Sequence, residues 1–183
     1  MSDGMIIFFA VLVLGLTGVF WYISTMNRFA RLVVKIAEAD SGIDVGLTKR
    51  HDTLAKMLDV TRAYARHESE TLASLVEMRK GMSMAERLEA NRQMDGIEGR
   101  LNLLAEAYPE LRSSENFKEL QQAVVEVEEH LQAARRIYNM NVSSFNQLLV
   151  SFPASIVGNI HKHTAREFFE ADEKKKEDVV MNF

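Results

Sequence analysis

A long run without charge begins close to the amino terminus and limits what the chain can fold into. Between Gly4 and Asn27 the sequence contains no charged residue, and Met5–Ser24 is mostly Ile, Phe, Val, Leu and Gly. At about 1.5 Å per residue, roughly 20 such residues form a helix of about 30 Å, which matches the hydrocarbon core of a bilayer. Buried helices of soluble proteins are usually shorter and keep a polar stripe. We therefore expect residues 1–27 to form a membrane anchor.

A cleaved signal peptide is the main alternative for this segment. Such a peptide has a basic start, a shorter apolar run and an exit with two small residues flanking a third. Here only Asp3 precedes the apolar run, and no such exit follows it. The composition favours an anchor that is not cleaved.

The residues that follow the apolar run indicate its orientation. Trp21 and Tyr22 lie at its end, where amphipathic rings favour the headgroup level of a membrane. Arg28, Arg31 and Lys35 come next. Because cytoplasmic flanks carry an excess of positive charge, we expect the amino terminus outside and the remainder of the chain in the cytoplasm.

The composition excludes several classes of protein. The chain has 183 residues and no cysteine, so disulfides, thiolate nucleophiles, iron–sulfur clusters and cysteine-based zinc sites are ruled out. A net charge of −4 argues against a general nucleic-acid binder. Only 2 prolines interrupt the chain, whereas an all-β protein needs frequent turns. We expect an all-α fold.

Two helices are predicted before Pro109. No proline precedes that position, so the anchor can continue into a first helix that ends at Gly81, with Gly42 and Gly46 as points where it can bend. Its apolar face follows three-four spacing: Ile36, Ala39, Ile43, Leu47, Arg50, Leu54, Met57, Thr61, Tyr64, Glu68, Leu72 and Leu75. Ser83 and Glu86 have capping-box spacing, which predicts the start of a second helix.

The clearest periodicity lies in a third helix. Its seam alternates steps of four and three, which predicts coiled-coil-like packing: Leu120, Val124, Val127, Leu131, Ala134, Tyr138, Asn141, Phe145, Leu148 and Phe152. Pro153 ends or kinks this helix, and a fourth helix is expected over residues 154–171.

These helices predict an antiparallel up-and-down bundle of three to four long helices over residues 28–171, followed by a charged tail over residues 172–183. The first and third helices are longer than the second. Seam positions of the first helix therefore extend beyond its partners, and copies of the same chain would cover them most simply.

The blocks of residues along this chain resemble the LemA family. They occur in one order after the anchor: Ile43-Asp44-Val45, Lys49-Arg50-His51-Asp52, Tyr64-Ala65-Arg66-His67-Glu68, Ala105-Glu106-Ala107-Tyr108-Pro109-Glu110-Leu111, Asn116-Phe117, Leu120-Gln121, Ala134-Arg135-Arg136, Tyr138-Asn139, Phe145-Asn146, Phe152-Pro153 and Phe168-Phe169-Glu170. The resemblance implies a single-pass helical protein of a bacterial cell (inner) membrane, with its short end outside and its helical domain in the cytoplasm. The family has no established enzymatic activity, and some members are associated with organising membrane compartments.

No reactive constellation emerges from the motifs. His67-Glu68-Ser69-Glu70-Thr71 begins like a zinc-protease motif but ends on Thr71 instead of a second histidine. None of the five histidines follows a glutamate at the spacing of a di-iron bundle, and no phosphate-binding glycine loop occurs. We expect no catalytic residue, no metal site and no cofactor.

Charged and amide side chains on the seams form the remaining candidate site. A desolvated charge must be paired. We expect an inter-helix polar layer drawn from Arg50, Asp52, Glu68, Arg135, Asn139 and Asn141. A polar pocket for a small ligand is the alternative interpretation of the same residues.

The sequence thus predicts a non-enzymatic scaffold anchored in a bacterial membrane, which self-associates on the cytoplasmic face and organises or shapes the membrane. The predicted partners are the lipid bilayer, through Trp21, Tyr22, Arg28 and Arg31, and further copies of the chain, with no nucleic acid. A signalling adaptor that binds another membrane-associated protein is the alternative. A third hypothesis, an enzyme with a polar core site, has the least support.

Overall fold

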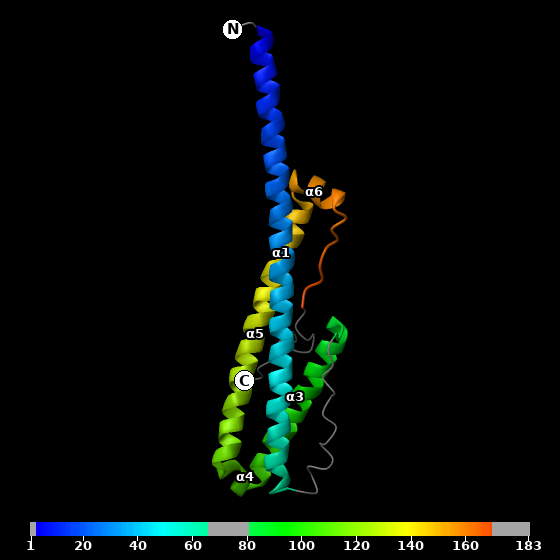
Figure 1. Cartoon of the computed structure of the whole chain (residues 1–183). Coiled ribbons are helices and arrows are strands. Elements are labelled where there is room, and N and C mark those ends of the chain that lie inside the picture. Colours follow the sequence, from blue (N-terminus) through cyan, green and yellow to red (C-terminus); the bar gives the residue numbers. More distant parts are fainter. Residues whose placement is uncertain (1–2, 66–80, 170–183) are drawn as a thin grey trace, which may run out of the picture. The chain divides into compact units, whose positions relative to one another are not determined.

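The structure, a computed structural model, describes residues 3–65 and 81–169. Within these ranges every regular element is a helix: α1 (Asp3–Arg62), α3 (Met84–Ala107), α4 (Pro109–Ser113), α5 (Glu115–Val150) and α6 (Ala154–Ile160). The prediction of an all-α fold with a long apolar first helix is confirmed (Figure 1).

The chain divides into two compact units. Unit 1 comprises residues 1–38 and 137–168, and unit 2 comprises residues 39–136 and 169–183. Both α1 and α5 contribute residues to each unit, so neither unit is a continuous stretch of sequence. The boundaries expected at residues 27/28 and 171/172 stay predictions.

The first part of α1 is apolar and uncovered. From Met5 to Phe20 its large hydrophobic side chains are between 44% and 75% exposed. Its most apolar stretch is long enough to cross a membrane, and none of that stretch is buried against the protein. A core helix of a soluble protein would be covered on at least one face, so this segment is a candidate membrane-spanning helix.

The second part of α1 packs one face into a helical core in unit 2. The predicted seam positions Ala39, Ile43, Leu47, Arg50, Leu54, Met57 and Thr61 are all buried. The helix continues unbroken through both glycines at which a bend was expected. A Cβ on Gly46 would come within 3.0 Å of Leu131, and one on Gly42 within 3.7 Å of Ala134. These glycines therefore lie at positions where α1 and α5 pack closely.

The end of α1 differs from the prediction. The helix ends at Arg62 and a turn leads to Ala65, well before Gly81. The seam positions Glu68, Leu72 and Leu75 lie outside the described residues. Gly81 has a φ of +81°, a conformation that favours glycine, and precedes α3. The predicted capping box is confirmed, with the Ser83 hydroxyl and the Glu86 carboxylate each accepting a backbone hydrogen bond.

The direction of α3 also differs from the expected alternation. Arg87, near the start of α3, pairs with Asp40 of α1, and Glu98 further along pairs with Arg50 of α1. Residue numbers rise together on both helices, so α3 runs parallel to α1. The antiparallel prediction is therefore wrong for this pair.

α5 follows the predicted heptad closely. Val124, Leu131, Tyr138, Phe145 and Leu148 are buried, at intervals of seven or three residues. The contacts of Leu131 with Gly46 and of Ala134 with Gly42 show that α5 runs antiparallel to α1. The last predicted seam position, Phe152, lies beyond the helix and is 83% exposed.

The predicted fourth helix is much shorter than expected. α6 ends at Ile160, and Lys162 then adopts a positive φ of 53°. The chain then continues without helix and is held by the Asn146 side chain. Asn146 Oδ1 accepts a hydrogen bond from the backbone N–H of Arg166 at 2.8 Å, and Asn146 Nδ2 donates one to the Arg166 carbonyl at 2.9 Å. Tyr138 donates to the Glu167 carbonyl. Backbone groups that a helix would pair internally are thus paired with side chains of α5.

Candidate functional site

A buried arginine on α1 is the centre of a charged layer in unit 2. The Arg50 side chain is 3% exposed. Its Nη2 lies 2.6 Å from Asp95 Oδ1 and 2.7 Å from Glu98 Oε2, while Nη1 donates to Asn91 Oδ1 at 2.8 Å. These three partners come from α3. One guanidinium therefore joins α1 to three side chains of α3.

α5 completes the layer. Glu128 Oε2 lies 3.3 Å from Arg50 Nη1, and its other oxygen lies 3.9 Å from Arg135 Nη1. The Arg135 guanidinium also stacks over the Phe169 ring, with its Cζ 4.9 Å from the ring centroid. Two arginines and three carboxylates thus meet where α1, α3 and α5 come together.

The two arginines have different electrostatic environments. Burial acts to lower the pKa of Arg50, but the hydrogen bond to Glu98 and the charges of Asp95 and Glu128 outweigh it, so this pKa is raised. The pKa of Arg135 is lowered, because burial dominates and the Arg50 charge opposes the effect of Glu128. The Arg135 Nε and Nη2 atoms are buried without a hydrogen-bond partner. Of the two arginines, Arg50 is therefore the one whose positive charge is more strongly stabilised by its neighbours.

A second arginine–carboxylate cluster, which sequence reasoning missed, joins α3 to α1. Arg87 Nη1 lies 2.5 Å from Asp40 Oδ1, and its Nε lies 3.0 Å from Asp44 Oδ1. The Arg87 side chain is 9% exposed. Both clusters place an arginine of one helix among acids of another, which fixes the register of α1 against α3.

The structure brings together only some of the predicted layer. Arg50 and Arg135 share Glu128. Asp52 is 63% exposed and pairs with the neighbouring His51, so it lies outside the layer. Asn141 belongs to unit 1, where its side chain donates to the Lys35 carbonyl of α1 at 3.2 Å.

The place of the remaining two members, Asn139 and Glu68, stays a prediction. Asn139 lies half-buried on α5 in unit 1. Glu68 lies outside the described residues. The layer residues of α3 carry a signal in the sequence, because Asn91, Asp95 and Glu98 follow four-three spacing and share one face of α3. A search for polar as well as apolar periodicity would have found them.

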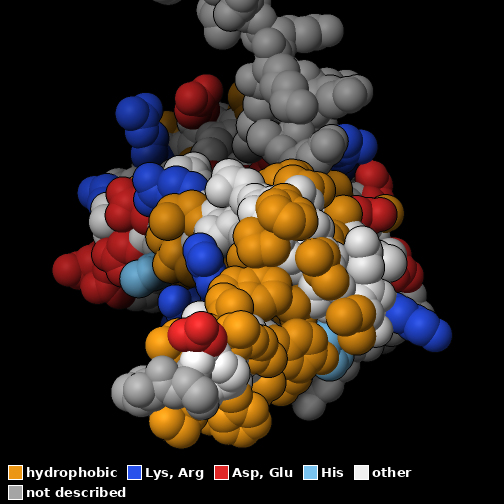
Figure 2. Space-filling view, turned by 90° about the horizontal axis from the view of Figure 1, so that it is seen from above, with side chains coloured by type: hydrophobic (Ala, Val, Ile, Leu, Met, Phe, Trp, Pro, Cys, Tyr) orange, Lys and Arg blue, Asp and Glu red, His pale blue; other side chains and the backbone are white. Residues whose placement is uncertain are grey.

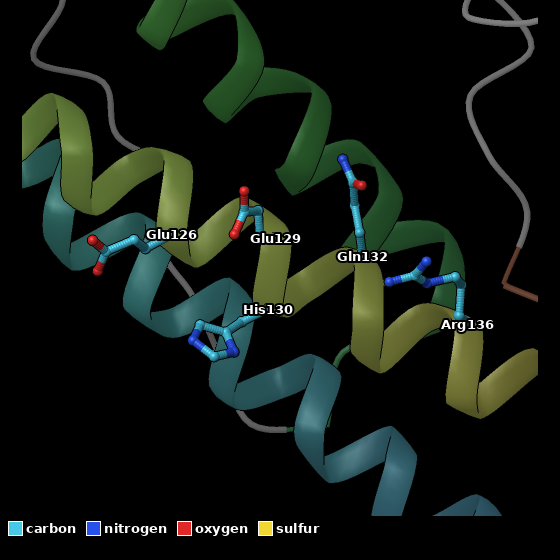
Figure 3. Close-up of a pocket in the computed structure, with 5 residues that line it drawn as sticks. All are labelled: Glu126, Glu129, His130, Gln132 and Arg136. Atoms are coloured by element: carbon cyan, nitrogen blue, oxygen red, sulfur yellow. The ribbon is translucent and has the colours of Figure 1, made fainter.

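Two shallow pockets adjoin the layer in unit 2. One has a volume of about 390 Å³ and is lined by Arg50, Asp95, Glu98, Gly99, Asn102, Glu128 and Gln132. The other, of about 480 Å³, lies against Glu126, Glu129, His130, Gln132 and Arg136. Figure 3 shows that these five side chains rise from α5 and fan out instead of converging on one point.

The chemistry of the layer is that of an ion-pair network. Its carboxylates are already paired with arginine, so none is free to act as a general base. Within residues 3–65 and 81–169, no three His, Asp or Glu side chains are grouped closely enough to hold a metal ion. The arrangement can fix the register of helices.

The predicted membrane-interface residues lie in unit 1. Tyr22 is half-buried, and its hydroxyl lies 3.0 Å from His161 Nε2. Trp21 is 36% exposed, and Arg28 and Arg31 are exposed on α1. Their role at a membrane surface stays a prediction.

Comparison with known proteins agrees with the arrangement of blocks in the sequence. A family model described as the LemA family matches residues 39–183. Protein LemA of Metamycoplasma hominis is 30% identical over 180 residues, an alignment that covers 94% of this chain and 82% of that protein. A match of this extent spans the helical core and the buried charged layer together. The chain therefore belongs to the LemA family.

Proposed function

We propose that this protein is a non-enzymatic scaffold, tethered to a bacterial inner membrane by its first helix and associated with further copies of itself on the cytoplasmic face, where it organises the membrane. One observation carries the proposal. α1 is a single helix of 60 residues whose first part is apolar and exposed and whose second part is buried in the core of unit 2.

The exposed part of α1 requires an apolar environment. Phe8, Leu14 and Phe20 are 64%, 72% and 75% exposed. Such a concentration of exposed hydrophobic surface is unfavourable in water and favourable in lipid. A helix satisfies its own backbone hydrogen bonds, as the hydrocarbon core demands. The positive flank formed by Arg28, Arg31 and Lys35 supports a cytoplasmic location for the remainder of the chain.

The charged layer supports a structural role and not a catalytic one. Arg50 is enclosed by acids of two other helices, and its raised pKa keeps it charged. A network of this kind specifies which helices meet and in what register. Reactive sites instead need a group whose proton affinity is tuned near neutral pH and which substrate can reach.

Self-association is the finer part of the proposal and needs its own support. The seam of α1 from Ala39 to Thr61 is buried within unit 2, so it offers no leftover surface there. Bulky apolar side chains do occur on the outer faces of unit 2: Leu103 of α3 and Val125 of α5 are 66% and 52% exposed. Contacts between copies would cover such side chains.

The mass of the full-length protein in detergent tests this proposal. We expect a particle of several copies and no second polypeptide. Leu103→Glu places a charge at an apolar outer position of α3 and should shift the particle towards the monomer. Ala85→Glu, at an exposed position on the same helix, is the matched control and should leave the mass unchanged.

A strictly monomeric particle at all concentrations would contradict the scaffold. Co-purification of another protein in fixed stoichiometry would favour the adaptor hypothesis instead. A separate experiment tests the orientation of the tether. The Val45→Cys variant contains a single thiol, which should react with a membrane-impermeant reagent only after the cells are opened.

A further inference from the structure

The turn between α5 and α6 exposes a group of large apolar side chains. We call Val150, Phe152, Ile156 and Ile160 the apolar corner; their exposed fractions are 79%, 83%, 49% and 60%. No Asp, Glu, Lys or Arg occurs from Ile137 to Ile160, an interval that includes the entire corner. Single exposed hydrophobic residues are ordinary, whereas four within eleven uncharged residues form an apolar patch of the kind that marks an interaction with protein or membrane.

The opposite face of α6 holds the corner in place. Ala154, Val157 and Gly158 are buried. A Cβ on Gly158 would lie 2.7 Å from Leu149 Cδ1 and 3.3 Å from Phe29 Cζ, so this helix packs closely on both α1 and α5. The exposed side chains are therefore not a mobile end that could fold inward, and their exposure belongs to the packed fold.

Contacts with α1 place the corner at the end of the candidate membrane span. The residue that follows α6, His161, contacts Tyr22, with 3.0 Å between Nε2 and the hydroxyl. His163 stacks on Phe29, with ring centroids 4.9 Å apart. Tyr22 and Phe29 flank the position where the uncharged run ends at Asn27. Figure 1 shows α6 beside α1 at the point where α1 leaves the cover of α5.

The surroundings of the corner have the charge that a membrane surface attracts. After the apolar run, unit 1 contains five basic residues, Arg28, Arg31, Lys35, Lys162 and Arg166, and two acidic residues, Glu38 and Glu167. Figure 2, seen from above the view of Figure 1, shows hydrophobic side chains gathered in the middle and lower part of the face, with charged side chains mainly towards its sides. Protein segments that lie in the membrane interface combine an apolar face with basic flanks in this way. The apolar face inserts among the lipid tails, and the basic residues are attracted to anionic headgroups.

We infer that the apolar corner inserts into the headgroup region of the same bilayer that α1 spans, as a second and shallow membrane contact. The inference rests on the proposed membrane tether, because only a spanning α1 brings the corner to the lipid surface. Tyr22 and Trp21 would then lie at the same depth, where aromatic rings are favoured. The contact restricts the tilt of the protein and so connects bilayer shape to the orientation of the helical domain.

Site-specific labelling of the full-length protein in vesicles tests the inference. The chain contains no cysteine, so each variant carries one labelled position. An environment-sensitive fluorophore is attached to Ile156→Cys, to Val13→Cys in the apolar run, and to Val45→Cys in unit 2. The vesicles contain phosphatidylcholine and phosphatidylglycerol, with quenchers placed either near the headgroups or deep in the acyl chains.

We expect the label at Ile156→Cys to emit at shorter wavelength than the label at Val45→Cys and to be quenched mainly by the shallow quencher. The label at Val13→Cys should be quenched mainly by the deep one. If Val13→Cys behaves in this way while Ile156→Cys resembles Val45→Cys, the corner faces water and the inference fails although the tether stands. If Val13→Cys escapes the deep quencher, the proposed tether itself fails.

A further outcome separates lipid from protein contact. A label at Ile156→Cys that is shielded from water but unaffected by either quencher would mean that a second copy covers the corner, and this would overturn the inference. Phe152→Ser tests the contribution of the most exposed side chain: we expect weaker shallow quenching of the Ile156→Cys label, and an unchanged signal would count against the contact. Because Phe152 is 83% exposed, this substitution leaves the packed face of α6 intact.

Discussion

Replacing Arg50 by methionine should destabilise the helical core far more than the same change at Arg135. The Arg50 side chain is 3% exposed and lies within hydrogen-bond distance of three side chains of α3. Arg50→Met keeps a long apolar side chain but removes the positive charge. It leaves the carboxylates of Asp95, Glu98 and Glu128 near one another without their shared partner.

The size of the effect follows from the exposure of those acids. Removing one partner of a fully buried ion pair costs about 3–5 kcal/mol. Asp95, Glu98 and Glu128 are 30%, 29% and 24% exposed, so water partly replaces the lost arginine. We therefore expect a loss of about 2–4 kcal/mol in the free energy of unfolding for Arg50→Met.

Arg135 provides the comparison within the same layer. Its contact with Glu128 is long, at 3.9 Å, and two of its guanidinium nitrogens are buried without a partner. A methionine there removes those unsatisfied groups and packs against the Phe169 ring. We expect Arg135→Met to change the free energy of unfolding by less than about 1 kcal/mol.

Urea unfolding of the full-length protein in detergent, followed by circular dichroism, measures both variants. With a slope of about 2 kcal/mol per molar urea, the expected loss for Arg50→Met lowers the midpoint by about 1–2 M. Adding Asp95→Asn and Glu98→Gln to Arg50→Met removes the charge imbalance and should recover part of the stability. Equal midpoints for Arg50→Met and Arg135→Met would refute the reasoning, because the layer would then not depend on its most enclosed charge.

Three further predictions follow from local geometry. Gly158→Ala should lower the free energy of unfolding by about 1 kcal/mol, because its methyl group would displace the end of the Leu149 side chain and press on the buried Phe29 ring. Gly96→Ala, which meets nothing within 4 Å in the middle of α3, should instead raise it by about 0.5–1 kcal/mol. Ser83→Ala removes the side-chain acceptor at the start of α3 and should cost about 1 kcal/mol in thermal or urea unfolding. The pKa of His163 is lowered by burial and by the nearby charges of His161 and Arg166, so protonation of this ring opposes folding. The contribution of His163 to stability is fully present above its unfolded pKa of 6.5 and is lost as the pH falls below that value. His163→Gln should therefore reduce the loss of stability at low pH in a series of unfolding curves.

Each of these outcomes has a clear opposite. Equal effects of the two glycine substitutions would mean that α6 does not pack closely on α5. An unchanged stability for Ser83→Ala would show that the cap contributes nothing to α3. Identical pH dependence with and without His163 would place the acid sensitivity elsewhere in the protein.

Some features were predictable because they depend on residues that are close in sequence. The apolar run of α1 defines a membrane-length helix through its composition alone. The heptad of α5 predicts its buried face, and Val124, Leu131, Tyr138 and Phe145 are buried as expected. The capping box of α3 is likewise local, since Ser83 and Glu86 satisfy each other across three residues.

The membership of the charged layer was only half predictable. That a buried arginine at position 50 needs acidic partners follows from the cost of an unpaired charge. Which acids supply it depends on how α3 and α5 lie beside α1, and a periodic seam does not specify that. Asp52, adjacent in sequence, points away, whereas Asp95 and Glu128 reach Arg50 from two other helices.

The helical class, the apolar first part of α1 and the buried faces of α1 and α5 were thus predictable from the sequence, because hydrophobic periodicity and capping act within one or two turns. Only the tertiary structure decided that α3 runs parallel to α1, that α6 ends at Ile160, and that the apolar corner lies beside Tyr22. These features depend on contacts between residues far apart in the chain, such as Asn146 with Arg166 and His161 with Tyr22. No local pattern encodes which distant side chain will hydrogen-bond to a free backbone N–H or carbonyl, or pair with a buried charge.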